Sequence, residues 1–134
     1  MSDAPKHVED IKHWQSFAFG DAEAMMRWLS AVGFVEHATY RDEADPAVVV
    51  HAEWLWPEGG GIMFGSLREG GVVRNVGGSA TYLVTGDPDA VFDRAVAAGA
   101  RVVQPLVEED YGGRGGSVED PEGNHWSFGS YQPR

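Results

Sequence analysis

An internal duplication limits the folds open to this sequence more than any other feature. A shift of 66 residues places Gly-Asp-Ala-Glu-Ala at 20–24 on Gly-Asp-Pro-Asp-Ala at 86–90. A shift of 64 residues places 57–66 on 121–130, with six of the ten positions identical. Two matches in the same order and at nearly the same offset predict two copies of one structural module.

Each copy opens with the pattern of a short helix. Asp21 and Asp87 stand where an N-terminal cap accepts a hydrogen bond from the first turn, and Gly33 and Gly99 suit the left-handed residue that ends a helix. Apolar residues recur between these caps at helical spacing. The predicted stripes are Met25, Trp28, Leu29 and Val32 in the first copy, and Val91, Ala95 and Ala98 in the second.

One strand-like segment precedes each predicted helix and three follow it. The segments cover 13–19, 34–40, 48–56 and 62–66 in the first copy, and 80–85, 101–104, 111–117 and 125–130 in the second. The sequence therefore predicts an α+β chain of two tandem βαβββ modules. The first module covers about 10–66 and the second about 79–131, with a Gly-rich linker at about 67–78.

Composition narrows the setting and the partners. A chain of 134 residues, 43% of them hydrophobic, is typical of a single domain, expected here over 1–134. There is no apolar run of membrane-spanning length and no signal-peptide pattern, so a cytoplasmic protein without membrane contacts is expected. The lack of cysteine excludes disulfides and thiolate metal sites. A net charge of −11 disfavours nucleic acid and favours a cationic ligand.

Several motifs resemble those of the glyoxalase / bleomycin-resistance / dioxygenase (vicinal oxygen chelate) superfamily, in its PhnB-like branch. They are Asp-Pro-Glu-Gly-Asn-His-Trp-Ser-Phe-Gly-Ser-Tyr at 120–131, His-Ala-Glu at 51–53, Ile-Met-Phe-Gly-Ser at 62–66 and Tyr-Gly-Gly-Arg at 111–114. The resemblance covers the chain from about His13 onward. It implies a curved mixed sheet around a cavity, but it does not select one activity, because lyases, isomerases, dioxygenases and drug-binding proteins share this scaffold.

The resemblance also implies where a metal ion would bind. Enzymes of the family hold a divalent metal with His or Glu from the first and last strands of each module. The first-strand position stands six residues before the Gly that opens the helix, and the last-strand position four residues after the Gly of Pro-Glu-Gly. These positions are Trp14, Met63, Ala80 and Ser127. None is a carboxylate or an imidazole, so no metal and no cofactor are expected there.

His51 and Glu53 offer a different arrangement. They stand two apart on a predicted strand, share a face, and form half of a possible metal site. Glu53 is also a candidate general base, although it has no placed partner. The alternative is a polar strand face near the surface or a dimer seam. His125 stands two residues before Ser127 and is expected on its face.

The substituted positions favour a site for an organic molecule. Trp14 offers a flat π surface for an aromatic ring or a cation, and Met63 is an adaptable apolar contact. Trp54 and Trp56 share a strand face and would extend this aromatic wall. The alternative is that Trp14 and Met63 fill the space vacated by the metal and belong to the core.

A glycine-rich loop in the second module is a candidate mouth of the cavity. Tyr111 and Arg114 would line it, although Arg114 is equally suited to an ion pair with Glu119 or Asp120.

Three functions remain open from the sequence. The first is a metal-independent, homodimeric protein that binds a small molecule and sequesters an aromatic or cationic drug or natural product. The second is an enzyme, either a metal-dependent lyase, isomerase or dioxygenase, or one that uses Glu53 without metal. The third is a structural or regulatory dimer with a filled cavity.

Overall fold

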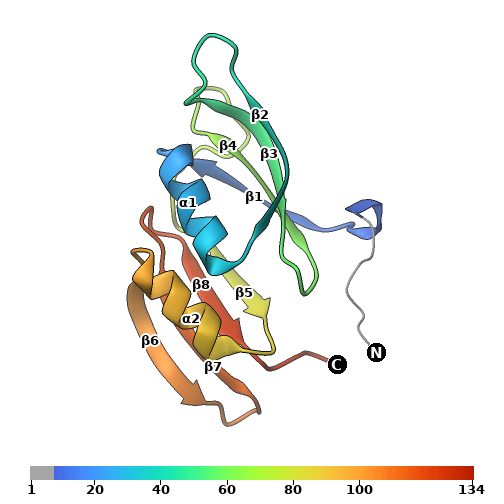
Figure 1. The fold of residues 1–134 in the computed structure, drawn as a ribbon, viewed down its shortest axis with the longest axis vertical. Coiled ribbons are helices and arrows are strands. Elements are labelled where there is room, and N and C mark those ends of the chain that lie inside the picture. The colour runs from blue at the N-terminus through green and yellow to red at the C-terminus, as the bar shows by residue number, and fades with distance from the viewer. Residues whose placement is uncertain (1–7) are drawn as a thin grey trace. The chain divides into compact units, whose positions relative to one another are not determined.

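The structure is a computed structural model that describes residues 8–134 (Figure 1). The chain divides between Val76 and Gly77 into two compact units. After a short 3₁₀ turn, η1 (Val8–Asp10), the first unit contains β1 (Trp14–Phe19), α1 (Ala22–Val32), β2 (Val35–Arg41), β3 (Val49–Leu55) and β4 (Gly61–Ser66). The second contains β5 (Ala80–Val84), α2 (Pro88–Ala97), β6 (Arg101–Glu108), β7 (Arg114–Glu119) and β8 (His125–Gly129). The predicted βαβββ order of both modules is confirmed.

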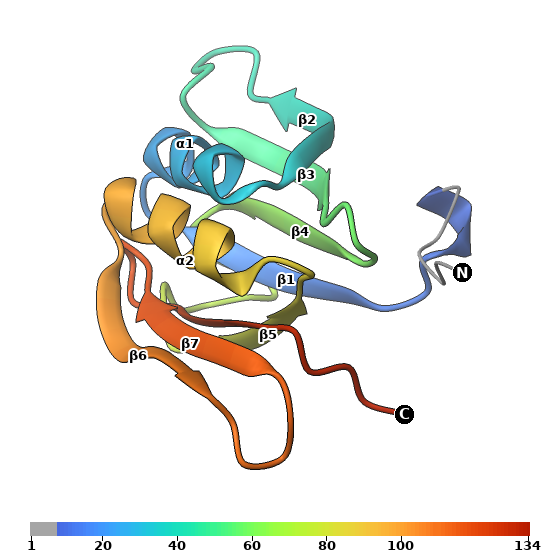
Figure 2. The same ribbon diagram turned by 60° about the horizontal axis from the view of Figure 1, so that its bottom comes forward.

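Both units have the same sheet topology. The first sheet has the strand order β1-β4-β3-β2, which can be followed from β2 to β1 in Figure 2, and the second has the order β5-β8-β7-β6. In each sheet the first strand runs parallel to the last, and the remaining neighbours are antiparallel. The duplication seen in the sequence is therefore a duplication of the complete strand arrangement.

The helix ends follow the predicted capping chemistry. The carboxylates of Asp21 and Asp87 each accept a hydrogen bond from a backbone N–H in the first turn, at 3.0 and 3.1 Å. Gly33 and Gly99 both adopt positive φ values, 132° and 118°. In the second helix the cap residue itself is Ala98, and Gly99 follows it.

The edge of the second sheet differs from the prediction. β6 continues to Glu108 rather than ending at Gln104, and β7 begins at Arg114 rather than at Tyr111. Pro105 lies inside β6, where the register with β7 is irregular. Since proline donates no backbone hydrogen bond, it is tolerated on such an edge strand. A proline within a run of apolar residues argues against a strand, and the sequence therefore predicted an earlier end.

A buried hydrogen-bond centre stabilises the second unit. Trp126 is fully buried, and its indole N–H donates to Asp120 Oδ2 at 2.8 Å. Asp120 Oδ1 accepts from the backbone N–H groups of Glu122 and Asn124, at 2.8 and 3.1 Å. One buried carboxylate thus joins the turn that precedes β8 to the core.

No helix among residues 8–134 is long and apolar enough to cross a membrane.

Candidate functional site

Strand register divides the first sheet into two faces. Ser16 lies opposite Met63, and Met63 lies opposite Glu53 on the next strand. Directly paired residues point to the same side of a sheet, and so do residues two apart on one strand. We call this side the Met63 face. It comprises Trp14, Ser16 and Ala18 of β1, Gly61, Met63 and Gly65 of β4, and His51, Glu53 and Leu55 of β3.

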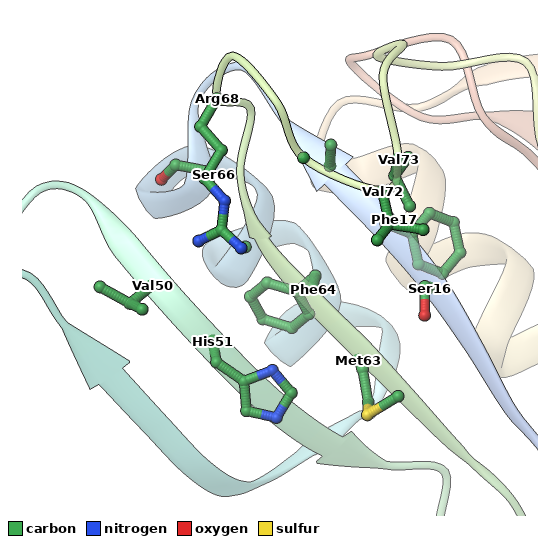
Figure 3. Close-up of a pocket in the computed structure, with 13 residues that line it drawn as sticks. Ser16, Phe17, Val50, His51, Met63, Phe64, Ser66, Arg68, Val72 and Val73 are labelled. Carbon is green, nitrogen blue, oxygen red and sulfur yellow. The ribbon is translucent and has the colours of Figure 1, made fainter.

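A crevice of about 280 Å³ opens beside Met63 and His51 (Figure 3). Strands β1, β3 and β4 contribute its sheet-derived lining, and the segment after β4 contributes the rest. The residues from that segment are Arg68, Gly71, Val72 and Val73. The crevice therefore lies within the first unit, between a sheet and a loop that the sequence had assigned to a linker. Its size is near the lower end for small-molecule sites.

His51 and Glu53 form a hydrogen-bonded pair. His51 Nε2 lies 2.8 Å from Glu53 Oε2, and the imidazole stacks on Tyr40 of β2 with ring centroids 6.3 Å apart. The prediction that His51 and Glu53 share a strand face is confirmed. Within residues 8–134 no third His, Asp or Glu joins them as a metal ion would require.

Trp14 lies on the Met63 face but outside the crevice lining. Its indole covers Gly61, so that a Cβ at position 61 would collide with the ring. The indole N–H donates to the Ile11 carbonyl at 3.2 Å, and the side chain is half-buried. The direct neighbour of Met63 on β1 is Ser16, two residues after Trp14. Trp14 and Met63 therefore share a face of the sheet but are not paired directly.

The other two predicted tryptophans are on the opposite side of the sheet. The Trp54 ring packs on Phe64 with centroids 5.7 Å apart, and its N–H donates to Thr39 Oγ1 at 3.0 Å. Trp56 packs on Phe34 at 5.2 Å. Both indoles are buried in the core. They therefore do not extend an aromatic wall beside Met63, because successive residues of a strand point to opposite faces.

The corresponding face of the second sheet is hydroxyl-rich. Ser127 lies opposite Tyr82 and Ser117, and its Oγ is 2.6 Å from Ser117 Oγ. Ala80 lies opposite His125, and this pair stands two positions before the pair of Tyr82 and Ser127 on the same two strands. His125 and Ser127 thus share a face, as predicted. Burial raises the pKa of the Tyr82 hydroxyl.

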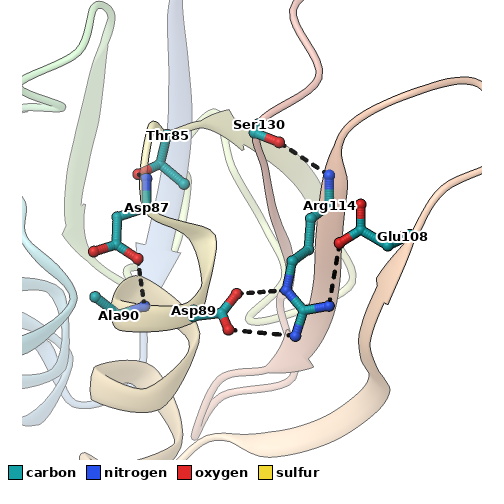
Figure 4. Close-up of polar contacts among 7 residues, drawn as sticks. All are labelled: Thr85, Asp87, Asp89, Ala90, Glu108, Arg114 and Ser130. Atoms are coloured by element: carbon teal, nitrogen blue, oxygen red, sulfur yellow. Dashed lines mark hydrogen bonds and ion pairs between the residues drawn. The ribbon is translucent and has the colours of Figure 1, made fainter.

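Arg114 is ion-paired, but with partners other than those predicted. Its guanidinium Nε and Nη2 donate to the two oxygens of Asp89 at 2.7 and 3.3 Å, and Nη1 lies 3.4 Å from Glu108 (Figure 4). Hydrogen bonding to Arg114 lowers the pKa of Asp89. Glu119 and Asp120, the predicted partners, are engaged elsewhere.

Two further predicted residues of the second unit have local partners. His125 Nε2 lies 3.3 Å from Glu119, which also binds Arg101 at 3.0 Å. Tyr111 is exposed and contacts Tyr131 edge to face, with ring centroids 5.1 Å apart.

Of the residues that line the crevice, sequence reasoning named only His51 and Met63, and it missed Ser16, Arg68 and Val72 among others. Ser16 was missed because the offset from the helix pointed to Trp14. Arg68 and Val72 lie in a segment without periodicity, so no local signal connected them with the sheet.

Comparisons with known proteins agree with this architecture. The family model described as Glyoxalase/Bleomycin resistance protein/Dioxygenase superfamily matches residues 11–128. The crystal structure of TioX from Micromonospora sp. ML1 is similar over 90% of this chain and 99% of that one, with 31% identity and a TM-score of 0.71. A glyoxalase-related enzyme from Fulvimarina pelagi matches 93% of this chain and 88% of its own, with 21% identity and a TM-score of 0.64.

A shorter match is found among curated proteins. An uncharacterized protein of Mycobacterium bovis is 50% identical over 48 residues, which make up 36% of this chain and 32% of that protein. The match thus spans about a third of the length of this relative.

Proposed function

Because the chain belongs to the Glyoxalase/Bleomycin resistance protein/Dioxygenase superfamily, we propose that it is a member that binds a small organic molecule without a metal ion. The ligand occupies the Met63 face of the first sheet, and the biological role is to sequester an aromatic drug or natural product. The observation that carries the proposal is the chemistry of the positions where the resemblance implies metal ligands.

The residues at those positions do not fit a metal ion. Trp14, Met63, Ala80 and Ser127 offer an indole, a thioether, a methyl group and a hydroxyl. Zn, Ni, Fe and Mn sites of this class need imidazole or carboxylate ligands. The residues paired with Met63 and Ser127 on the first strands, Ser16 and Tyr82, supply only two more hydroxyls.

The same substitutions create a surface suited to an organic ligand. Met63 is unbranched and polarisable, and it adapts to ligands of different shape. Gly61 and Gly65 flank it on β4 without side chains, and the half-buried indole of Trp14 continues the apolar surface along β1. An aromatic ring would replace water over this surface at little cost, because few polar groups compete for hydration.

The His51–Glu53 pair favours a second candidate function. These two side chains supply an imidazole and a carboxylate 2.8 Å apart, directly beside Met63. Completed by further ligands, they would hold the metal of a lyase, isomerase or dioxygenase. Without metal, Glu53 would act as a general base oriented by His51.

Metal analysis separates metal-independent binding from the metal-dependent form of the second candidate. Protein purified without added metal is expected to contain far less than one divalent ion per chain, because two ligands alone bind such ions weakly. The measurement is elemental analysis of the wild type beside His51→Ala. A stoichiometric metal that is lost in His51→Ala, together with a metal-dependent reaction, would establish the enzyme instead.

We also propose that the protein is a homodimer. Strands β2 and β6 each end a sheet and carry exposed apolar side chains, among them Val35 and Tyr40 on β2 and Val102 and Val107 on β6. Exposed strand edges with apolar side chains favour association, which removes an aggregation hazard. Analytical ultracentrifugation is expected to give twice the chain mass at micromolar concentration. A single species of monomer mass under these conditions contradicts the proposal.

A further inference from the structure

The charge of the crevice differs from the charge of the whole chain. The chain carries 21 acidic and 10 basic residues, with a net charge of −11. Yet the crevice lining includes no Asp or Glu, and its ionisable residues are Arg68 and His51. The local lining is therefore basic in an acidic protein, and this matters for the ligand more than the total charge does, because distant charges are screened by salt.

Among residues 8–134, Arg68 has no partner that neutralises its charge. Its side chain is exposed and forms no ion pair or hydrogen bond with any residue in the described range 8–134. By contrast, Arg41 and Arg114 each bind carboxylates. Figure 3 shows the Arg68 guanidinium directed over β4, between Val50 and Phe64 and toward His51. A free guanidinium at the rim of a crevice is suited to a planar anion, which it binds through two parallel hydrogen bonds.

His51 presents a second polar contact to the same space. Its Nε2 is held by Glu53, and the stacked Tyr40 ring fixes the plane of the imidazole. No residue in the described part of the chain bonds Nδ1, which remains available to a ligand. Glu53 is hydrogen-bonded to His51 and is not among the residues that line the crevice.

Apart from the serines Ser16 and Ser66, the remaining side chains of the crevice are apolar. Val72 is 98% exposed at the loop side, and Val50 on β3 is exposed as well. Both line the crevice together with Met63. An exposed valine gains from contact with a ligand, because burial removes its apolar surface from water.

We propose that the crevice binds an aromatic carboxylate, with its ring between Met63 and Val72 and its carboxylate on Arg68. This inference rests on the proposed binding function. It specifies an anionic ligand, whereas the acidic composition of the whole chain favours a cationic one. Arg68 is then the residue that determines specificity, and His51 Nδ1 supplies a further polar contact.

Three probes with one ring system test the charge preference. They are 1-naphthoate, neutral 1-naphthamide and cationic 1-naphthylmethylammonium, titrated into the wild-type protein at about 150 mM salt, where the Debye length is about 8 Å. We expect naphthoate to bind about five- to tenfold more tightly than naphthamide, as a partly exposed charge-assisted hydrogen bond permits. The ammonium probe should bind most weakly. The methyl resonance of Met63 should shift with each probe that enters the crevice.

Two matched variants assign the preference to one residue. Arg68→Gln should abolish the difference between naphthoate and naphthamide while leaving naphthamide affinity within about twofold. Arg74→Gln removes the same charge from the same segment, but Arg74 does not line the crevice. It should keep the full naphthoate preference, which controls for the change in net charge.

The outcomes distinguish a failure of the role assigned to Arg68 from a failure of the proposed binding function. Equal binding of the three probes, preference for the ammonium probe, or a naphthoate preference that survives Arg68→Gln overturns the assignment of Arg68 and leaves the binding function standing. No binding of any probe, with no shift of the Met63 resonance, overturns the binding function together with it.

Discussion

Asp120→Ala should lower the free energy of unfolding by about 3–5 kcal/mol, because it leaves three hydrogen-bond donors without an acceptor in a buried environment. These donors are the indole N–H of Trp126 and the backbone N–H groups of Glu122 and Asn124. Asp120 is 4% exposed, so water cannot replace the carboxylate without opening the turn. Thermal denaturation followed by circular dichroism should show a midpoint lower by roughly 10–20 °C.

Two comparisons make this prediction specific. Asp110→Ala removes an exposed carboxylate from the same unit and should change the midpoint by no more than about 2 °C. Asp120→Asn keeps the oxygen that accepts the backbone N–H groups and places an amide N–H₂ against Trp126, so an intermediate loss is expected. Equal stability of Asp120→Ala and Asp110→Ala would mean that this hydrogen-bond centre does not stabilise the unit.

For aromatic ligands long enough to extend along β1 from the crevice to Trp14, Trp14→Ala should weaken binding by about ten- to thirtyfold, which corresponds to about 1–2 kcal/mol for one lost stacking partner. The fold should persist, with a loss of stability below about 3 kcal/mol, because the Trp14 indole is half-buried over Gly61 rather than enclosed. The effect should grow with ligand length, because Trp14 lies beyond the crevice along β1. Naphthoate and anthracene-9-carboxylate, titrated into both proteins, measure this difference.

The opposite result would identify Trp14 as part of the core. In that case Trp14→Ala would destabilise the protein by about 3–5 kcal/mol, as expected when a large side chain leaves a cavity. The wild-type protein would then show no ligand-dependent shift of its midpoint. Trp14→Phe is the control, since it keeps an aromatic surface over Gly61 and should retain most of both the stability and the affinity.

The sequence by itself determined the modules, the order of their elements and their helix ends. The duplication required two copies of one arrangement, and the structure has the same strand order in both sheets. Asp21 and Asp87 were recognisable as caps because capping depends on a side chain and the backbone three residues away. Alternation along one strand likewise placed His51 and Glu53 on a common face.

Only the tertiary structure decided which strand faces and residues meet. Alternation shows that Trp54 and Trp56 share a face of their strand, but it does not show whether that face is the core side or the Met63 side of the sheet. Pairing of Trp54 with Ile62 on β4 settles this, because it puts Glu53 rather than Trp54 beside Met63. Similarly, alternation along β1 places Trp14 and Ser16 on the same face and does not distinguish them. Only the register with β4 shows that Ser16 is the neighbour of Met63.

Arg68 shows the limit most clearly. It lies in a segment without periodicity, where no local rule gives the direction of a side chain. Its position over β4 and the lack of a partner among residues 8–134 follow from the path of the chain after Ser66. Alternation along the strands therefore shows which residues of β3 share a face with one another. The loop that completes the candidate site is visible only in the tertiary structure, because contacts between a loop and a sheet join residues that no local pattern connects.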